Sequence, residues 1–316
     1  MASLNSHCKD LSKFWKGKIL WDTPMSNYST FKVGGPADAI ISVTNIKGLK
    51  RLIHWLKKNA INWRILGRGS NILVPDQGLS GVTILLGGKF ICIEKLDRGR
   101  GQNKDSILIR AGAGCLLSKV THYCTINALS GFEFAIGIPG SIGGAVVMNA
   151  GAWSHEIESL LDSATLMDNN GEVYTERGKN LGFSYRGWGM EHNTVLLYAN
   201  FTLTRGNKEI IKDACRKYQE SRKNNQPLTE PSAGSFFKNP PEQSAGRLID
   251  EAGLKGHSIG GAKISEKHAN FIVNTGSASA TDILNLMRLV QNSVYKQFGI
   301  KLEPEVHILG DVEKQL

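Results

Sequence analysis

The sequence lacks the long apolar segments and the paired cysteines that mark membrane proteins and disulfide-rich proteins. No run approaches the roughly 18 consecutive apolar residues that a membrane-spanning helix needs. The five cysteines are scattered and include no C-x-x-C pair, and the eight histidines show no metal-ligand spacing. Residues 1–18 contain no apolar core followed by a small-residue cleavage site. We therefore expect a cytoplasmic protein with reduced thiols, without membrane insertion and without a metal centre.

The two commonest nucleotide-phosphate motifs are also missing. The chain contains no G-x-x-x-x-G-K-[ST] loop, and no G-x-G-x-x-G joins a strand to a helix. Residues 67–69 (GRG) are followed by residues 70–72 (SNI), so the third glycine, which permits close packing of helix on strand, is absent. A nicotinamide-binding Rossmann domain is therefore not expected.

What the sequence does contain is two glycine-rich turns, at residues 67–71 and 137–145, each after a short apolar run. Glycines allow close approach of the backbone to a ligand, and successive N–H groups in such turns form concave anion sites. A helix N-terminus adds its positive dipole end. Two such turns predict one extended diphosphate ligand held from both sides, as a dinucleotide cofactor would be. The alternative is a pair of ordinary glycine-rich turns.

The formal net charge is +10, and the basic residues are spread thinly along the chain. A nucleic-acid-binding protein would concentrate them in runs or on one face. The densest patch, residues 98–104, is predicted to be a solvated hairpin loop between residues 90–96 and 106–111. A basic surface also attracts small polyanions such as diphosphates and carboxylates. We therefore expect small-molecule ligands and no nucleic acid.

Short apolar runs alternate with helical patterns over residues 39–204 and predict an α+β region. Apolar periodicity predicts helices around residues 49–56 and 116–124, and D-N-N-G at residues 168–171 predicts a tight hairpin turn. Strands are expected at residues 39–43, 63–66, 72–74, 82–86, 107–111, 163–167, 173–176 and 194–204.

The C-terminal third has a different pattern, of helices separated by proline and glycine. Residues 209–222 predict a polar helix, 224–231 a proline-bounded linker and 270–274 a strand. Residues 239–242 (NPPE) predict the start of a helix that ends at Gly253. Residues 279–282 (SATD) predict a second helix start, and Gly299 closes that helix. This β/α module of about one hundred residues is long enough for a separate domain.

Seven short segments occur in an order that is typical of one enzyme family. They are residues 30–38 (TFKVGGPAD), 67–73 (GRGSNIL), 132–151 (FEFAIG to NAG), 183–186 (FSYR), 234–240 (GSFFKNP), 267–274 (KHANFIVN) and 303–306 (EPEV). Each segment alone is weak evidence, whereas the ordered set is specific. The chain resembles the UDP-N-acetylenolpyruvoylglucosamine reductase family. The spacing of 49 from Arg186 to Ser235 (235 − 186) resembles the shorter class without a tyrosine-bearing insert, which implies a more open substrate pocket.

The resemblance implies an α+β fold that joins an FAD-binding part of the vanillyl-alcohol oxidase/p-cresol methylhydroxylase type to a C-terminal α/β substrate-binding domain. The implied FAD-binding region is residues 1–208, with two subdomains that meet near residue 86. Residues 209–302 would bind the substrate, and residues 303–316 would return to the FAD-binding region. FAD would be bound non-covalently, and the implied cofactor-binding residues are Gly67, Arg68, Gly69, Ser70, Asn71, Gly137, Pro139, Gly140, Ser141, Gly143, Gly144 and Ala145.

The implied reaction is the NADPH-dependent reduction of UDP-N-acetylglucosamine enolpyruvate to UDP-N-acetylmuramate, in peptidoglycan precursor synthesis and hence in cell shape and division. Arg186 would contact the substrate carboxylate, for which a guanidinium fork is suited. Glu305 would polarise or protonate the developing enol, and Ser235 would give the proton to carbon. Without the resemblance, each would be interpreted as a surface or turn residue. The implied substrate-binding residues are Tyr185, Lys238 and Asn239.

Three residues, Trp188, Asn225 and His307, differ from those that many relatives carry, so the diphosphate contacts of the substrate are left open. His268 is expected to pack or to cap. Two other functions stay open at this point. One is an oxidase or dehydrogenase of the same flavin fold, for which a histidine or cysteine placed for covalent flavin attachment would argue, and neither glycine turn contains one. The other is a basic binding protein that is not an enzyme. A monomer is expected.

Overall fold

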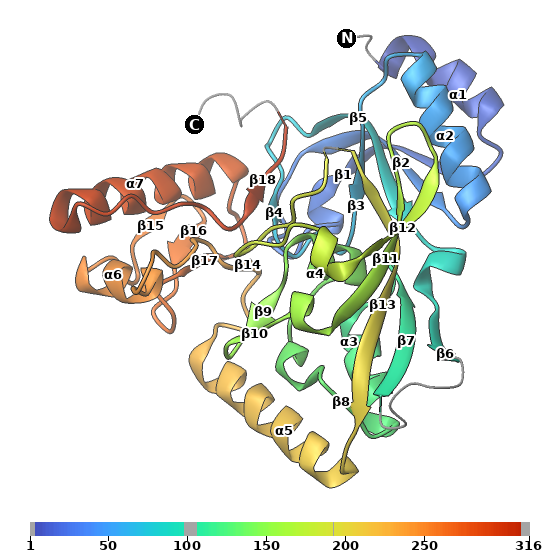
Figure 1. Ribbon diagram of the computed structural model, residues 1–316. Helices are drawn as coiled ribbons and strands as arrows, with labels where there is room; N and C mark the ends of the chain where they lie inside the picture. The colour runs from blue at the N-terminus through green and yellow to red at the C-terminus, as the bar shows by residue number, and fades with distance from the viewer. Residues whose placement is uncertain (1–3, 98–105, 192, 311–316) are drawn as a thin grey trace. The chain divides into compact units, whose positions relative to one another are not determined.

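The computed structural model describes residues 4–97, 106–191 and 193–310, and Figure 1 labels its helices and strands. The chain divides into two compact units. The first contains Met1–Leu20, Ile40–Arg68 and Gly81–Glu220, and the second contains Trp21–Ala39, Gly69–Ser80 and Ser221–Leu316. The predicted domain limits at residues 208 and 302 stay predictions, and the predicted loop at residues 98–104 lies outside the described residues.

A six-stranded antiparallel sheet is the main sheet of the first unit (Figure 1). Its order is β12-β11-β13-β7-β6, and β8 pairs with β13. Met167 pairs with Val173, and the Gly171 amide donates to the Asp168 carbonyl at 3.0 Å, so the predicted hairpin at residues 168–171 is confirmed. The strands are β6 (Ile93–Leu96), β7 (Ser106–Gly112), β8 (Leu129–Ser130), β11 (Leu161–Met167), β12 (Val173–Arg177) and β13 (Val195–Arg205).

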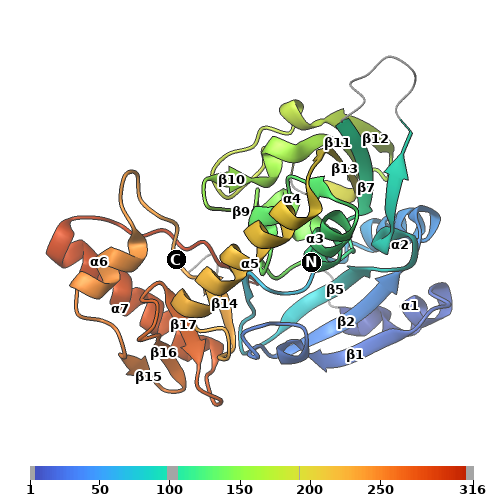
Figure 2. The same ribbon diagram turned by 90° about the horizontal axis from the view of Figure 1, so that it is seen from below.

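Helices α3 (Leu117–Ile126) and α4 (Ile142–Val147) pack on this sheet and share its apolar core (Figures 1 and 2). α3 buries Val120 and Cys124, which lie one turn apart, as its periodicity predicts. Burial raises the pKa of the Cys124 thiol to about 12. All five cysteines lie in the described residues, and none of them forms a disulfide bond there.

The other large sheet has the strand order β1-β2-β5-β3, and β3 and β5 are parallel. The strands are β1 (Ile19–Pro24), β2 (Pro36–Val43), β3 (Trp63–Leu66) and β5 (Leu79–Leu86). Helix α2 (Ile46–Lys58) begins at Asn45, whose side chain accepts from the Gly48 amide. It buries one apolar stripe, as predicted for residues 49–56, consisting of Leu49, Leu52, Ile53 and Leu56.

The remaining short elements of this part of the chain lie outside the two large sheets. They are helix α1 (Cys8–Phe14), the hairpin strands β9 (Gly151–Ala152) and β10 (His155–Glu156), and the 3-10 turns η1 (Leu4–His7), η2 (Met25–Asn27), η3 (Gly88–Ile91), η4 (Glu133–Ala135), η5 (Ile157–Leu160) and η6 (Gly178–Asn180). Helix α5 (Lys208–Asn225) is polar, as predicted, and runs three residues beyond the predicted end of the helix.

The second unit is built on a four-stranded sheet of order β14-β17-β16-β15. Helices α6 (Ala245–Glu251) and α7 (Ala280–Phe298) bury their apolar residues in the same core. The strands are β14 (Ser232–Ser235), β15 (Ser258–Ile259), β16 (Ala262–Ile264) and β17 (Phe271–Asn274). A separate parallel pair joins β18 (His307–Ile308) to β4 (Ile72–Leu73), so the C-terminal segment packs beside the first glycine turn.

The predicted helix start at residues 239–242 is wrong. α6 begins at Ala245, and its N-cap is Ser244, whose hydroxyl accepts from the Arg247 amide. Residues 240–243 form a turn instead, in which Glu242 has a φ of 59°. Asn239 still helps to cap the helix, because its side-chain oxygen accepts from the Ala245 amide at 3.0 Å. The prediction therefore missed both the intervening turn and the N-cap residue, Ser244.

The predicted start of α7 is confirmed as a capping box. The Ser279 hydroxyl accepts from the Asp282 amide, and the Asp282 carboxylate accepts from the Ser279 amide at 2.9 Å. Asp76, which precedes β5, accepts from the amides of Ala280 and Thr281 at 2.8 and 2.9 Å. The helix also ends as predicted, at Gly299, whose φ is 72°. The first two amides of α7 are thus satisfied by the Asp76 carboxylate and the third by the Ser279 hydroxyl.

We expect Asp282→Asn to lower stability at neutral pH by about 0.3–1 kcal/mol, the usual contribution of an anion in the first turn of a helix. The backbone hydrogen bond from Ser279 holds the pKa of the Asp282 carboxyl below its usual value. A lowered pKa means that the stabilisation is present above the unfolded pKa and is lost as the pH falls through the folded one. Thermal unfolding of both proteins from neutral to acid pH should show the difference in Tm shrink on acidification. A difference that persists at acid pH would contradict this assignment.

Candidate active site

The first glycine turn, residues 67–71, leads from β3 towards β4. Gly69 has a φ of 63°, and a Cβ atom there would lie 1.9 Å from the Tyr28 carbonyl oxygen. Its own carbonyl accepts from the Thr30 amide at 3.0 Å. At the end of the turn, the Asn71 side chain donates to the Glu305 carbonyl at 3.0 Å. Backbone contacts from two other segments therefore fix the shape of this turn.

The second glycine turn, residues 137–145, leads into α4. Gly137 and Gly140 have φ values of 76° and 144°. The hydroxyl of Ser141, the N-cap, accepts from the Gly144 amide. The amides of Ile142 and Gly143 donate to the carbonyls of Cys115 and Ala113, each at 2.8 Å. The start of α4 therefore offers fewer open amides than the glycine pattern indicates. The cofactor contacts of Gly143, Gly144 and Ala145 stay predictions.

The two glycine turns meet within the first unit. A Cβ atom at Gly67 would lie 2.5 Å from the Ser141 hydroxyl oxygen, so the start of one turn lies against the N-cap of α4 in the other. Only a residue without a side chain leaves the Ser141 hydroxyl in place at this point. The main chain at Gly67 therefore packs closely against the Ser141 side chain.

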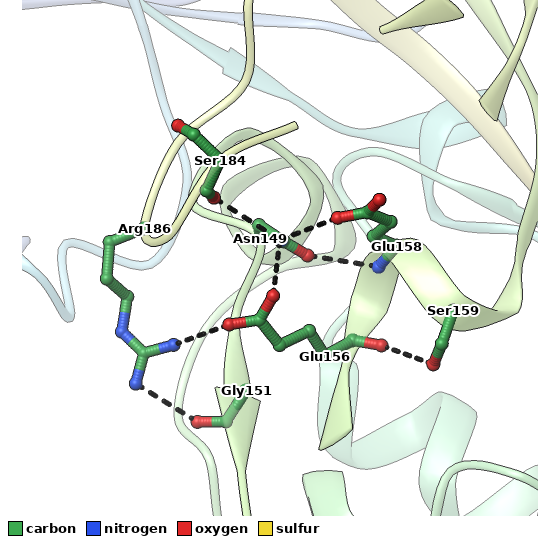
Figure 3. Close-up of polar contacts among 7 residues, drawn as sticks. All are labelled: Asn149, Gly151, Glu156, Glu158, Ser159, Ser184 and Arg186. Carbon is green, nitrogen blue, oxygen red and sulfur yellow. Dashed lines mark hydrogen bonds and ion pairs between the residues drawn. The ribbon is translucent and has the colours of Figure 1, made fainter. Parts of the chain in front are cut away.

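Arg186 lies in a tight turn of the first unit, shown in Figure 3. Ser184 and Gly187 exchange both backbone hydrogen bonds, at 3.0 and 3.2 Å, and Arg186 between them has a φ of 61°. Its guanidinium donates to the Gly151 carbonyl at 3.3 Å and lies 3.8 Å from a carboxylate oxygen of Glu156. The guanidinium carbon also lies 4.8 Å from the centre of the Tyr185 ring. The backbone and the side chain of Arg186 are therefore both held.

Two further residues of this cluster, Asn149 and Glu156, were not predicted from the sequence (Figure 3). The Asn149 side-chain amide donates to Glu156 at 2.8 Å and to the Ser184 carbonyl at 3.3 Å. Asn149 lies within a recognised segment, residues 132–151, but Glu156 lies beyond it. The β9–β10 hairpin returns Glu156 to the side of Gly151, and no local pattern shows that pairing.

Ser235 and Glu305 belong to the second unit, and backbone hydrogen bonds bring their segments together. Ser235 is the last residue of β14. The amide of Glu305 donates to the carbonyl of Phe236 at 2.8 Å, and the amide of Lys238 donates to the carbonyl of Glu303 at 2.9 Å. Two members of the predicted catalytic set are thus joined by one short backbone ladder, while Arg186 belongs to the first unit.

The predicted substrate-binding residues differ in the contacts that they make within the protein. Tyr185 is 46% exposed and lies beside Arg186. The Lys238 ammonium is 3.7 Å from the Glu303 carboxylate. The side-chain oxygen of Asn239 caps α6, as described above, so that oxygen has a structural role. The substrate contacts of these three residues stay predictions.

His268 is a packed histidine, one of the two roles expected for it. Its ring lies edge-on to Phe271, with 4.8 Å between centroids, and its Nδ1 accepts from the Asn270 amide. Burial lowers its pKa and so favours the neutral ring. Trp188 packs on the core of the first unit, and His307 is exposed in β18.

Two further findings concern the described part of the chain. Among residues 4–97, 106–191 and 193–310, no group of three or more His, Cys, Asp and Glu side chains could hold a metal ion. None of the helices in these ranges is long and apolar enough to cross a membrane.

Comparison with known proteins assigns a class to each part of the chain. Residues 37–176 match the family model of an FAD binding domain, and residues 226–309 match that of the UDP-N-acetylenolpyruvoylglucosamine reductase C-terminal domain. The structure also resembles a VAO-type flavoprotein from Myceliophthora thermophila, with a TM-score of 0.50 and 14% identity over 95% of this chain and 64% of that one. The chain is a flavin-dependent oxidoreductase, and the predicted α+β fold of the vanillyl-alcohol oxidase type with a C-terminal domain is confirmed.

Full-length relatives identify the family. The chain is 41% identical over 297 residues to UDP-N-acetylenolpyruvoylglucosamine reductase of Caldanaerobacter subterraneus subsp. tengcongensis, covering 94% of this chain and 95% of the relative. It is 42% identical over 299 residues to that of Halalkalibacterium halodurans, covering 93% and 95%. The crystal structure of the Thermus caldophilus reductase matches with a TM-score of 0.78 and 35% identity over 93% of this chain and 98% of that one. The chain belongs to the UDP-N-acetylenolpyruvoylglucosamine reductase family.

Proposed function

We propose that the protein reduces UDP-N-acetylglucosamine enolpyruvate to UDP-N-acetylmuramate with NADPH, through non-covalently bound FAD, in peptidoglycan precursor synthesis. The observation that carries the proposal is the backbone ladder that brings the segments of Ser235 and Glu305 together in a chain of this family. The reaction needs a group that protonates carbon beside a group that polarises the enol. Ser235 would supply the proton, and Glu305 would polarise the enol.

The glycine turns would bind the diphosphate of FAD. Gly67 of the first turn lies against the Ser141 side chain of the second, and Gly69 and Gly137 have positive φ values, which glycine adopts without strain. The chemistry that FAD would supply there is hydride transfer between NADPH and the substrate. Residues 67–71 and 137–145 would hold this cofactor without a Rossmann domain.

The proposed catalytic residues would stabilise negative charge and transfer a proton; they are Arg186, Ser235 and Glu305. Negative charge develops on the substrate carboxylate and its adjacent carbon, and the Arg186 guanidinium would stabilise it. The Ser235 hydroxyl would give its proton to that carbon. A serine hydroxyl is a weak acid, so this transfer needs a strongly basic carbon and a polar relay, for which Glu305 is the candidate.

The proposal includes the predicted division of labour along the chain. Residues 1–208 would bind FAD, residues 209–302 would bind the nucleotide sugar, and residues 303–316 would return Glu305 to the flavin-binding region. The matches to an FAD binding domain and to a family C-terminal domain support this order. We also propose that the protein is a cytoplasmic monomer.

The absorbance spectrum of the purified protein tests the proposed function. We expect a yellow protein whose flavin band NADPH bleaches in the absence of oxygen, and whose colour UDP-N-acetylglucosamine enolpyruvate restores. UDP-N-acetylglucosamine, which lacks the enolpyruvyl group, is the matched control and should restore nothing. If NADPH bleaches the flavin and the enolpyruvyl substrate leaves it bleached, the protein is an oxidoreductase for another substrate. A flavin-free preparation that binds nucleic acid with a steep salt dependence would overturn the proposal altogether.

A further inference from the structure

Arg186 is more firmly placed than an ordinary surface arginine. The side chain of Arg186 is 17% exposed. Its backbone has a left-handed conformation, which non-glycine residues adopt only where their surroundings enforce it. Its Nη2 donates to the Gly151 carbonyl, while its Nη1 faces Oε1 of Glu156 at 3.8 Å (Figure 3). The two terminal nitrogens therefore point at two fixed oxygens of the β9–β10 hairpin.

The Glu156 carboxylate joins Arg186 to a buried amide. Its second oxygen, Oε2, accepts from the Asn149 side chain at 2.8 Å, so the two oxygens face two different partners. A carboxylate held in this way presents one oxygen in a fixed direction. The Glu156 side chain is 34% exposed, which means that solvent screens part of its attraction for Arg186. Its main effect on the guanidinium is therefore one of orientation.

Asn149 couples that carboxylate to the turn that carries Arg186. Asn149 is 0% exposed, and its side-chain oxygen accepts from the Glu158 amide at 3.0 Å. Its side-chain nitrogen donates to Glu156 and also to the Ser184 carbonyl at the base of the turn. One buried amide thus binds both the carbonyl at the start of the arginine turn and the carboxylate whose other oxygen faces the guanidinium.

We propose that Glu156 is a positioning residue, which Asn149 holds so that its carboxylate aims the Arg186 guanidinium at the carboxylate of the enolpyruvyl substrate. The inference rests on the proposed function for the identity of the substrate. An arginine side chain has several rotatable bonds, and bidentate binding of a carboxylate requires the planar fork to be aligned beforehand. The carboxylate of Glu156 supplies that alignment without touching the substrate.

The primary test compares Glu156→Gln with a matched control, Glu158→Gln. The glutamine of the first variant keeps the shape and can still accept from Asn149, but it loses the charge that faces Arg186. Glu158 also accepts from Asn149, at 3.3 Å, but Figure 3 shows it on the far side of Asn149 from Arg186. Its replacement therefore removes a carboxylate from the same cluster and leaves the charge that faces Arg186 in place. We expect Glu156→Gln to lower kcat/KM for the enolpyruvyl substrate about tenfold, with flavin reduction by NADPH unchanged. Glu158→Gln should match the wild type in both steps.

A double-mutant cycle with Arg186→Ala separates positioning from other roles. If Glu156 acts through Arg186, Glu156→Gln should cause no further loss in the Arg186→Ala background. An independent loss in that background, or wild-type kinetics for Glu156→Gln, would overturn the proposal. Glu156→Asp keeps the charge, so its kcat/KM should lie between those of Glu156→Gln and the wild type. This variant still tests the proposal if the glutamine variant does not fold.

Crystal structures of the two glutamine variants provide a readout that does not depend on activity. The Arg186 guanidinium should leave the Gly151 carbonyl in Glu156→Gln and stay on it in Glu158→Gln. An unmoved guanidinium in both variants refutes the positioning role, whatever the substrate is. A wild-type enzyme that NADPH reduces but the enolpyruvyl substrate does not reoxidise would refute the proposed function alone.

Discussion

Ser235→Ala should slow reoxidation of the reduced enzyme by the enolpyruvyl substrate by about 10²- to 10⁴-fold, the usual contribution of a positioned proton donor. Reduction of the flavin by NADPH should continue at the wild-type rate, because that step needs no proton on the substrate carbon. Rapid-mixing absorbance measurements of each half-reaction separate the two effects.

Ser232→Ala is the matched control for this variant. Ser232 lies at the other end of β14, where it pairs with Val273, and the substitution removes the same hydroxyl group. It should leave both half-reactions intact. If Ser235→Ala is reoxidised as fast as the wild type, another group supplies the proton, and the role proposed for Ser235 is wrong.

Elements governed by neighbouring residues could be predicted from the sequence. The apolar spacing of α2, the D-N-N-G turn at residues 168–171 and the capping box of α7 each depend on groups within four residues of one another, so their patterns are local. The family segments extended this prediction to the fold and to Arg186, Ser235 and Glu305. The backbone ladder between Phe236 and Glu305 then shows how two of these residues come together.

Contacts between distant segments could not be predicted in the same way. Asp76 caps α7 from 204 positions upstream, and the hairpin that returns Glu156 to Gly151 is set by pairing, not by composition. The start of α6 was misplaced because Asn239 caps the helix across an intervening turn. In each case a polar side chain serves a backbone group that local spacing does not reveal.

Gly69→Ala should have the largest effect on stability of the changes considered. An added Cβ atom would lie 1.9 Å from the Tyr28 carbonyl oxygen, and the backbone that carries this oxygen cannot yield as a side chain would. The positive φ of 63° adds strain of its own. We expect the free energy of unfolding to fall by more than about 4 kcal/mol, a loss typical of severe steric conflicts. Little folded, flavin-bearing protein should then be recovered. Thermal unfolding and the flavin content after purification measure the effect.

Gly299→Ala separates steric conflict from backbone strain. Gly299 has a φ of 72°, close to that of Gly69, but a Cβ atom there would meet nothing within 4 Å. Its replacement should therefore cost only the left-handed strain of about 1–2 kcal/mol and leave a yellow, folded protein. Equal losses in the two variants would mean that φ alone governs both positions. A Gly69→Ala protein with normal stability and bound flavin would show that the first turn can move away from Tyr28, contrary to the rigid cradle that the proposed flavin site requires.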